Sequence, residues 1–178
     1  MKAQFNTTLP FVVLYFITFC SLWTYGDWFQ AGLSAALAPM LIWLSVCDMN
    51  TLEIPDIATL GVAIVSAVAV WISGTASLVV HLSTGLLVMG FFWLVGELYF
   101  RHAKQEGLGI GDAKLFGAGA ILLGPLKLPE FLLFSSLGGI VGYLMATVFS
   151  NGPRQGIPFG PFVAYSIFIL SLLNGVFV

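Results

Sequence analysis

The sequence predicts an all-α membrane protein, a polytopic bundle of six to seven transmembrane helices. Hydrophobic residues make up 59% of the 178 residues and charged residues 8%, whereas soluble domains contain about 25% charged residues. The mean hydropathy is +1.02. Apolar segments of about 20 residues, the length that crosses a ~30 Å hydrocarbon core as a helix, recur along the whole chain. This composition leaves too little polar surface for a water-soluble fold.

Hydropathy and the positions of Gly, Pro and charged residues divide the chain into seven predicted helices. They cover 9–25, 29–48, 55–73, 76–100, 112–128, 130–149 and 158–177. The fifth segment is the least apolar, because strongly apolar sequence extends only from Ala113 to Leu123. We therefore expect a short or partly re-entrant helix there. No soluble domain fits between the helices, and 1–178 is predicted to be one integral-membrane domain.

The orientation follows from the distribution of Lys and Arg, which favour the cytoplasmic side of a membrane. With a cytoplasmic amino terminus, five of the six positive charges lie on the cytoplasmic side: Lys2, Arg101, Lys104, Lys114 and Arg154. Lys127 alone lies outside. The chain is therefore expected to be a multi-pass protein of the inner (cytoplasmic) membrane.

Charge and cysteine content exclude other classes of function. The net charge is −2 and there is no basic run, so nucleic acid is not an expected partner. Cys20 and Cys47 lie inside apolar segments and do not form a CxxC pair. We therefore predict no metal site.

Two carboxylates stand out, because a charged group within a membrane segment is costly and usually functional. Asp48 ends the second predicted helix and Asp112 begins the fifth. Two crossings separate the loops that follow Asp48 and precede Asp112, so both loops lie on the same side of the membrane in either orientation. The topology therefore predicts that the two carboxylates meet near one face.

Other polar residues have structural explanations. Glu97 precedes Arg101 by four residues, the spacing of a helical ion pair. Asp56 follows Pro55, and proline and acids both suit a helix start. His81 is expected to pack between helices or to lie at the membrane interface. The remaining acids fall in connections or at helix ends and are interpreted as solvated: Asp27, Glu53, Glu106 and Glu130.

Three blocks of the sequence resemble the type IV prepilin peptidases, membrane aspartyl proteases with a GxGD motif. The first is DMNTLEIPD at 48–56, the second EGLGIGDAKL at 106–115, and the third IPFGPFVA at 157–164. They occur in the order of that family and cover the chain from about Leu41 to its carboxyl end. Three alternating glycines before a helix also allow another chain to approach closely.

The resemblance implies that Asp48 and Asp112 are catalytic and that Gly109 and Gly111 are the glycines of the motif. It implies cleavage of short basic leaders from prepilins or type II secretion pseudopilins at the cytoplasmic face, next to a hydrophobic helix, without a cofactor. Lys114 either tunes Asp112 electrostatically or extends to the membrane interface.

The sequence departs from many members of that family in one respect. They carry a large loop with paired CxxC motifs that bind zinc, associated with N-methylation of the product. Here the first connection, at about 25–30, is short and there is no CxxC. We therefore predict a peptidase without N-methyltransferase activity.

Two alternatives remain open from the sequence. Buried carboxylates and glycine-interrupted helices also occur in ion- or proton-coupled transporters, and an inactive scaffold would retain the same residues. The sequence leaves the oligomeric state undetermined.

Overall fold

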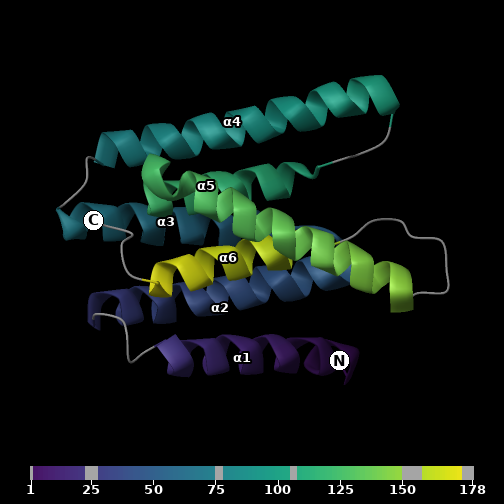
Figure 1. The fold of residues 1–178 in the computed structure, drawn as a ribbon, viewed down its shortest axis with the longest axis horizontal. Coiled ribbons are helices and arrows are strands. Elements are labelled where there is room, and N and C mark those ends of the chain that lie inside the picture. Colours follow the sequence, from purple (N-terminus) through teal and green to yellow (C-terminus); the bar gives the residue numbers. More distant parts are fainter. Residues whose placement is uncertain (1, 23–27, 75–77, 105–107, 150–157, 174–178) are drawn as a thin grey trace.

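The computed structural model describes residues 2–22, 28–74, 78–104, 108–149 and 158–173. Within these parts of the chain there are six helices, all roughly aligned along one direction (Figure 1). They are α1 (Lys2–Leu22), α2 (Trp28–Thr51), α3 (Asp56–Ser73), α4 (Leu78–Ala103), α5 (Ile110–Phe149) and α6 (Gly160–Leu172).

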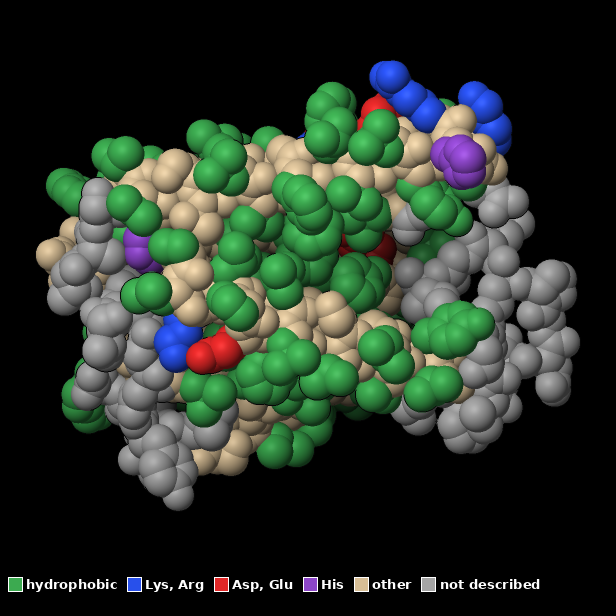
Figure 2. All heavy atoms as spheres, turned by 45° about the horizontal axis from the view of Figure 1, so that its top comes forward, with side chains coloured by type: hydrophobic (Ala, Val, Ile, Leu, Met, Phe, Trp, Pro, Cys, Tyr) green, Lys and Arg blue, Asp and Glu red, His purple; other side chains and the backbone are tan. Residues whose placement is uncertain are grey.

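The surface and the helix lengths are those of a multi-pass membrane protein. By length and composition, four helical segments are long and apolar enough to cross a membrane: Trp28–Thr51, Asp56–Ser73, Leu78–Ala103 and Ile110–Leu144, the last of which is broken at Gly124. Thr8–Ser21 and Gly160–Leu172 are apolar but shorter. Large apolar side chains cover the face seen in Figure 2. The all-α membrane class is thus confirmed at the level of four long candidate spans and two shorter apolar helices.

Helix α5 contains a break at Gly124, whose φ of 68° and ψ of −178° are not helical. The predicted boundary between the fifth and sixth helices, near residue 129, is wrong by about one turn. Glycine tolerates this conformation, which other residues avoid. Pro125 follows it and suits the first position of a new helix, where a missing N–H is not needed. Pro129, by contrast, lies inside the second half.

The chain reverses direction at this break (Figure 1). The rings of Phe116 and Phe131 lie 5.4 Å apart, although fifteen residues of straight helix would separate them by about 22 Å. The first half of α5, residues 110–123, is about 20 Å long at 1.5 Å per residue. It is therefore short, as expected, and the second half returns to the end at which the first half began.

Helix α6 lies in the centre of the bundle, and its side chains are almost all buried. Leu41 and Leu44 of α2 belong to the same buried cluster as Ile167. The ring of Tyr15 of α1 lies 4.5 Å from that of Phe168, in a tilted arrangement. Since α6 contacts α1, α2 and α5, its amino terminus is fixed in position by the core.

The connection from α2 to α3 and the start of α5 lie at the same end of the bundle (Figure 1). Helix α2 ends at Thr51, and Leu52 then adopts a left-handed conformation with φ of 57°. Its N–H donates to the carbonyl of Asp48 at 2.9 Å. This agrees with the prediction that the loops beside Asp48 and Asp112 share one side.

Candidate active site

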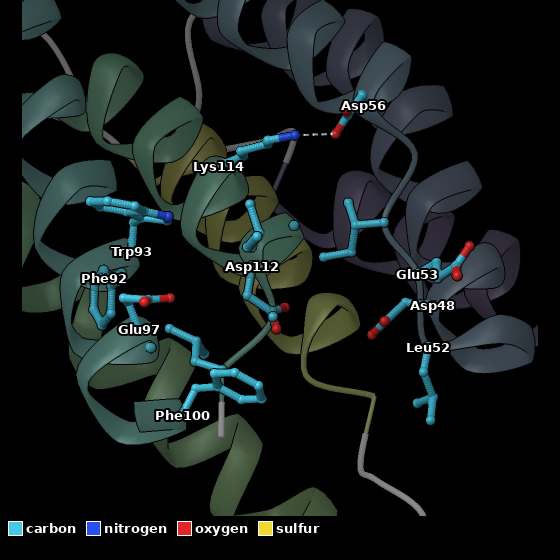
Figure 3. A pocket seen from close by; sticks show the side chains of 16 residues that line it. Asp48, Leu52, Glu53, Asp56, Phe92, Trp93, Glu97, Phe100, Asp112 and Lys114 are labelled. Atoms are coloured by element: carbon cyan, nitrogen blue, oxygen red, sulfur yellow. Dashed lines mark hydrogen bonds and ion pairs between the residues drawn. The ribbon is translucent and has the colours of Figure 1, made fainter. Parts of the chain in front are cut away.

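A cavity of about 630 Å³ opens at this end of the bundle. In the space-filling view, acidic side-chain atoms are visible at the bottom of a hollow with apolar walls (Figure 2). The cavity lies between the end of α2, the start of α3, the carboxyl half of α4 and the start of α5 (Figure 3). Its lining includes most of the acidic residues of the described chain: Asp48, Glu53, Asp56, Glu97 and Asp112.

Asp48 lies in the last turn of α2 and is 5% exposed. Its Oδ2 accepts a hydrogen bond of 2.9 Å from the backbone N–H of Gly160. Gly160 begins α6, and the first N–H groups of a helix have no partner within that helix. The positive end of the α6 dipole also favours a carboxylate there. Asp48 is thus held by a helix that begins 112 residues later.

Asp112 is the third residue of α5 and is half-buried. Gly109 lies beside its carboxylate, since a Cβ added at Gly109 would be 3.3 Å from Oδ2 of Asp112. An acid at this position can cap the start of a helix. The other oxygen, Oδ1, is buried and has no hydrogen-bond partner among the described residues. A buried polar atom without a partner often marks a functional site.

The two carboxylates point toward each other across the cavity (Figure 3). They are close enough to interact electrostatically. Two like charges at short range repel each other when both are ionised, so such a pair tends to share a proton. This arrangement has the components for acid–base hydrolysis, in which one carboxylate activates water and the other donates a hydrogen bond.

Glycines and one isoleucine bring the three sequence blocks together. A Cβ added at Gly111 would lie 2.9 Å from Cβ of Ile54. At Gly160 it would lie 2.9 Å from Oδ2 of Asp48 and 3.0 Å from Cδ1 of Ile54. Ile54 therefore packs between the starts of α5 and α6, and both contacts require the absence of a side chain. Sequence reasoning assigned no role to Ile54 or Gly160, although both belong to blocks that it identified.

Lys114 forms its ion pair with Asp56 and not with Asp112, while electrostatic tuning of Asp112 and extension to the interface both stay predictions. Its Nζ lies 2.7 Å from Oδ1 of Asp56, and the side chain extends away from Asp112 (Figure 3). Asp56 begins α3 as predicted, but it also joins α3 to the first turns of α5. The side chains of Lys114 and Asp56 are 39% and 73% exposed, so this ion pair lies at the outer edge of the cavity.

Two further predictions are confirmed, the Glu97–Arg101 ion pair and the packing of His81 between helices. Glu97 forms the expected ion pair with Arg101 at 2.7 Å. Glu130 pairs with Lys127 at 3.3 Å, beyond the break in α5. His81 is buried between α4 and α5. Among the described residues there is no group of three or more His, Cys, Asp or Glu side chains that could hold a metal ion. Arg154 and Glu106 lie outside the described residues.

Comparison with known proteins agrees with the geometry. Residues 35–144 match the type IV leader peptidase family. A type 4 prepilin-like protein leader peptide-processing enzyme of Escherichia coli is 31% identical over 142 residues, which is 75% of this chain and 50% of that protein. A prepilin leader peptidase/N-methyltransferase of Legionella pneumophila is 29% identical over 171 residues, 92% of this chain and 58% of that protein.

A prepilin leader peptidase/N-methyltransferase of Pseudomonas putida is 32% identical over 155 residues, 84% of this chain and 52% of that protein. The chain thus spans about half of the length of these relatives. No solved structure matches it significantly. The family match covers more than half of the chain, including both Asp48 and Asp112. The chain belongs to the type IV leader peptidase family.

Proposed function

We propose that this chain is an intramembrane aspartyl endopeptidase that uses Asp48 and Asp112 to remove the leader peptide from prepilins or type II secretion pseudopilins. The observation that carries the proposal is the cavity in which two carboxylates, from helices remote in sequence, point toward each other. Residues 1–178 act as one membrane peptidase domain.

The chemistry is general acid–base hydrolysis without a covalent intermediate. One aspartate takes a proton from a water molecule as the water oxygen attacks the scissile carbonyl carbon, and the other, protonated, hydrogen-bonds to the carbonyl oxygen. The C–N bond then breaks, and the departing amine takes up a proton from the aspartate pair. The shared proton moves between the two groups during the cycle. Gly109 and Gly111 leave the backbone beside Asp112 accessible, which suits an extended peptide that must lie close to it.

The environment of the cavity supports a substrate with a basic leader and an apolar helix. Acidic side chains surround the cavity, and they favour a cationic peptide over an anionic one. The outer surface of the neighbouring helices is apolar (Figure 2). A hydrophobic segment of the substrate would therefore remain in contact with lipid and protein while the adjoining peptide reaches the carboxylates.

We place the protein in the inner membrane with six to seven transmembrane helices and a cytoplasmic amino terminus. Arg101 lies in the last turn of α4 and Lys104 follows that helix, next to the cavity-lining Phe100, and positive charge favours the cytoplasmic side. The active site then faces the cytoplasm. Lys127 follows the break in α5, at the opposite end of the first half from Asp112.

We expect leader cleavage without methyl transfer, since the 178 residues contain two cysteines, both outside any CxxC pair. Mass spectrometry of the mature pilin product, after incubation with the purified chain and S-adenosylmethionine, tests this. The expected product has an unmodified amino terminus. A mass increase of one methyl group would contradict the expectation.

The proposed function is tested with the purified chain in proteoliposomes and a tagged prepilin. Leader removal is expected from the wild type and from Glu130→Gln, a carboxylate change beyond the break in α5, and is expected to be lost in Asp48→Ala and Asp112→Ala. A pH-sensitive dye in the same vesicles measures proton flux. Carboxylate-dependent flux without cleavage would support a transporter instead. The absence of both cleavage and proton flux would support the inactive scaffold.

A further inference from the structure

A polar contact holds the first half of α5 at the end remote from Asp112. His81 of α4 is 6% exposed, and its Nδ1 lies 2.8 Å from the carbonyl oxygen of Ile121. A carbonyl oxygen accepts hydrogen bonds and does not donate them. The hydrogen therefore resides on Nδ1 of His81, which donates to Ile121.

The break in α5 explains why this carbonyl needs an outside donor. In an α-helix the carbonyl of Ile121 would accept from the N–H of the residue four positions later. That residue is Pro125, which has no N–H. An unpaired carbonyl in an apolar interior is costly, and within a membrane no water is present to satisfy it. His81 supplies the donor that the sequence of α5 lacks.

Gly124 makes room for the histidine ring. A Cβ at Gly124 would lie 2.5 Å from Cε1 and 2.8 Å from Nε2 of His81. A side chain at residue 124 is thus excluded by the ring as well as by the positive φ of 68°. Gly124, Pro125 and His81 form one structural unit, although His81 lies more than forty residues earlier in the chain.

The interface that this unit terminates is closely packed. The face of α4 toward the first half of α5 carries residues spaced by three or four: His81, Gly85, Met89 and Phe92. A Cβ at Gly85 would lie 2.8 Å from the carbonyl oxygen of Gly117, so the two backbones are in close contact there. The rings of Phe92 and Phe116 stack at 4.4 Å. Ile121 packs over Gly85 and Met89 packs over Gly117, and the His81 hydrogen bond adds a directional contact at the end of this interface.

We infer that His81 is a positioning residue, whose hydrogen bond to Ile121 fixes the axial register of the half-helix that carries Asp112. A slip by one residue would move Asp112 by about 1.5 Å and rotate it by about 100° about the helix axis. A displacement of about 1 Å in a catalytic group lowers rates by roughly 100-fold. The consequence for cleavage rests on the proposed function, whereas the hydrogen bond and the register do not.

Three substitutions at residue 81 separate the donor from the bulk of the ring. In His81→Asn the side-chain amide can place a donor at the position of Nδ1, in His81→Gln the donor lies one carbon farther out, and in His81→Leu it is absent. With the prepilin reporter, His81→Leu and His81→Gln are expected to lower kcat by roughly 10- to 100-fold with little change in KM. His81→Asn is expected to retain kcat within about threefold of the wild type, which corresponds to less than about 1 kcal/mol in activation free energy.

His102→Leu is the matched control, because His102 is the other histidine of the chain and is exposed near the end of α4. It is expected to leave kcat unchanged. Wild-type kcat in His81→Leu, or equal loss in His81→Asn and His81→Leu, would overturn the inference.

A spectroscopic readout tests the hydrogen bond without any activity assay. In His102→Leu labelled with ¹⁵N-histidine, His81 gives the imidazole signals, and its Nδ1 is expected at the chemical shift of a protonated ring nitrogen that donates a hydrogen bond. An unprotonated Nδ1 would overturn the inference, even if the protein cleaves prepilins. If the protein cleaves none, the proposed function fails while this measurement still decides the role of His81.

Discussion

Asp48 and Asp112 lie in one cavity, but different parts of the chain hold them. Asp48 receives its hydrogen bond from Gly160, at the start of a central helix far away in the sequence. Asp112 lies beside Gly109, within the same helix start, and its buried Oδ1 has no partner among the described residues. Asp48 therefore depends on tertiary packing, and Asp112 on local structure and on the position of its half-helix.

This difference indicates distinct tasks for the two groups. An oxygen already engaged by a backbone N–H is fixed in orientation. A carboxylate oxygen with no protein partner is available to bind water or a substrate group. We infer that Asp112 Oδ1 is the oxygen that first contacts the reacting atoms, while Asp48 is the more rigid partner.

Gly160→Ala is expected to have the largest effect among the supporting positions. The new Cβ would lie 2.9 Å from Oδ2 of Asp48 and 3.0 Å from Ile54, so the carboxylate or the start of α6 must move. We expect kcat on the prepilin reporter to fall by roughly 100-fold. The control is Gly90→Ala, where a Cβ would meet nothing within 4 Å. Full activity in Gly160→Ala would show that Asp48 does not depend on this contact.

Gly109→Ala is expected to have a smaller effect on Asp112. Its Cβ would lie 3.3 Å from Oδ2 of Asp112, a contact that a small side-chain shift relieves. Alanine also caps helices less well than glycine, at a cost of about 1 kcal/mol, or about fivefold in rate. Steady-state kinetics with the same reporter measures this loss of kcat. A loss as large as that of Gly160→Ala would contradict the difference drawn between the two aspartates.

The Asp56–Lys114 ion pair is expected to matter least. Exposed ion pairs contribute about 0–1 kcal/mol, so Asp56→Asn and Lys114→Met should each change kcat by less than about fivefold. Their effects should be similar and should diminish in ~1 M salt, where exposed charges are screened. A loss of 100-fold or more in Lys114→Met, with Asp56→Asn unaffected, would instead indicate that Lys114 acts on Asp112.

Composition and topology were sufficient to predict the membrane class and the common side of the two acids. Both follow from properties that add along the chain, namely apolarity and the number of crossings between loops. The Glu97–Arg101 pair was equally accessible, because its spacing is fixed by one helix. These features require no knowledge of how the helices pack.

Features made by packing were not predicted. The boundary between the two halves of α5 was predicted near residue 129, whereas the break is at Gly124. Several glycines and prolines interrupt the apolar pattern in this region, and the conformation of Gly124 also depends on the ring of His81. The partner of Lys114 is a residue of another helix. Gly160 donates to Asp48 across 112 positions, and no local pattern relates two residues so far apart.

The most direct test of the paired carboxylates is the cleavage rate of a purified prepilin reporter by Asp48→Asn, Asp112→Asn and the double variant. Groups that act as a unit are not additive in their effects. Each single variant is expected to fall to the uncatalysed background, at least ~1,000-fold below the wild type, and the double variant no further. Wild-type cleavage by either single variant, or two partial losses that multiply in the double variant, would contradict the account.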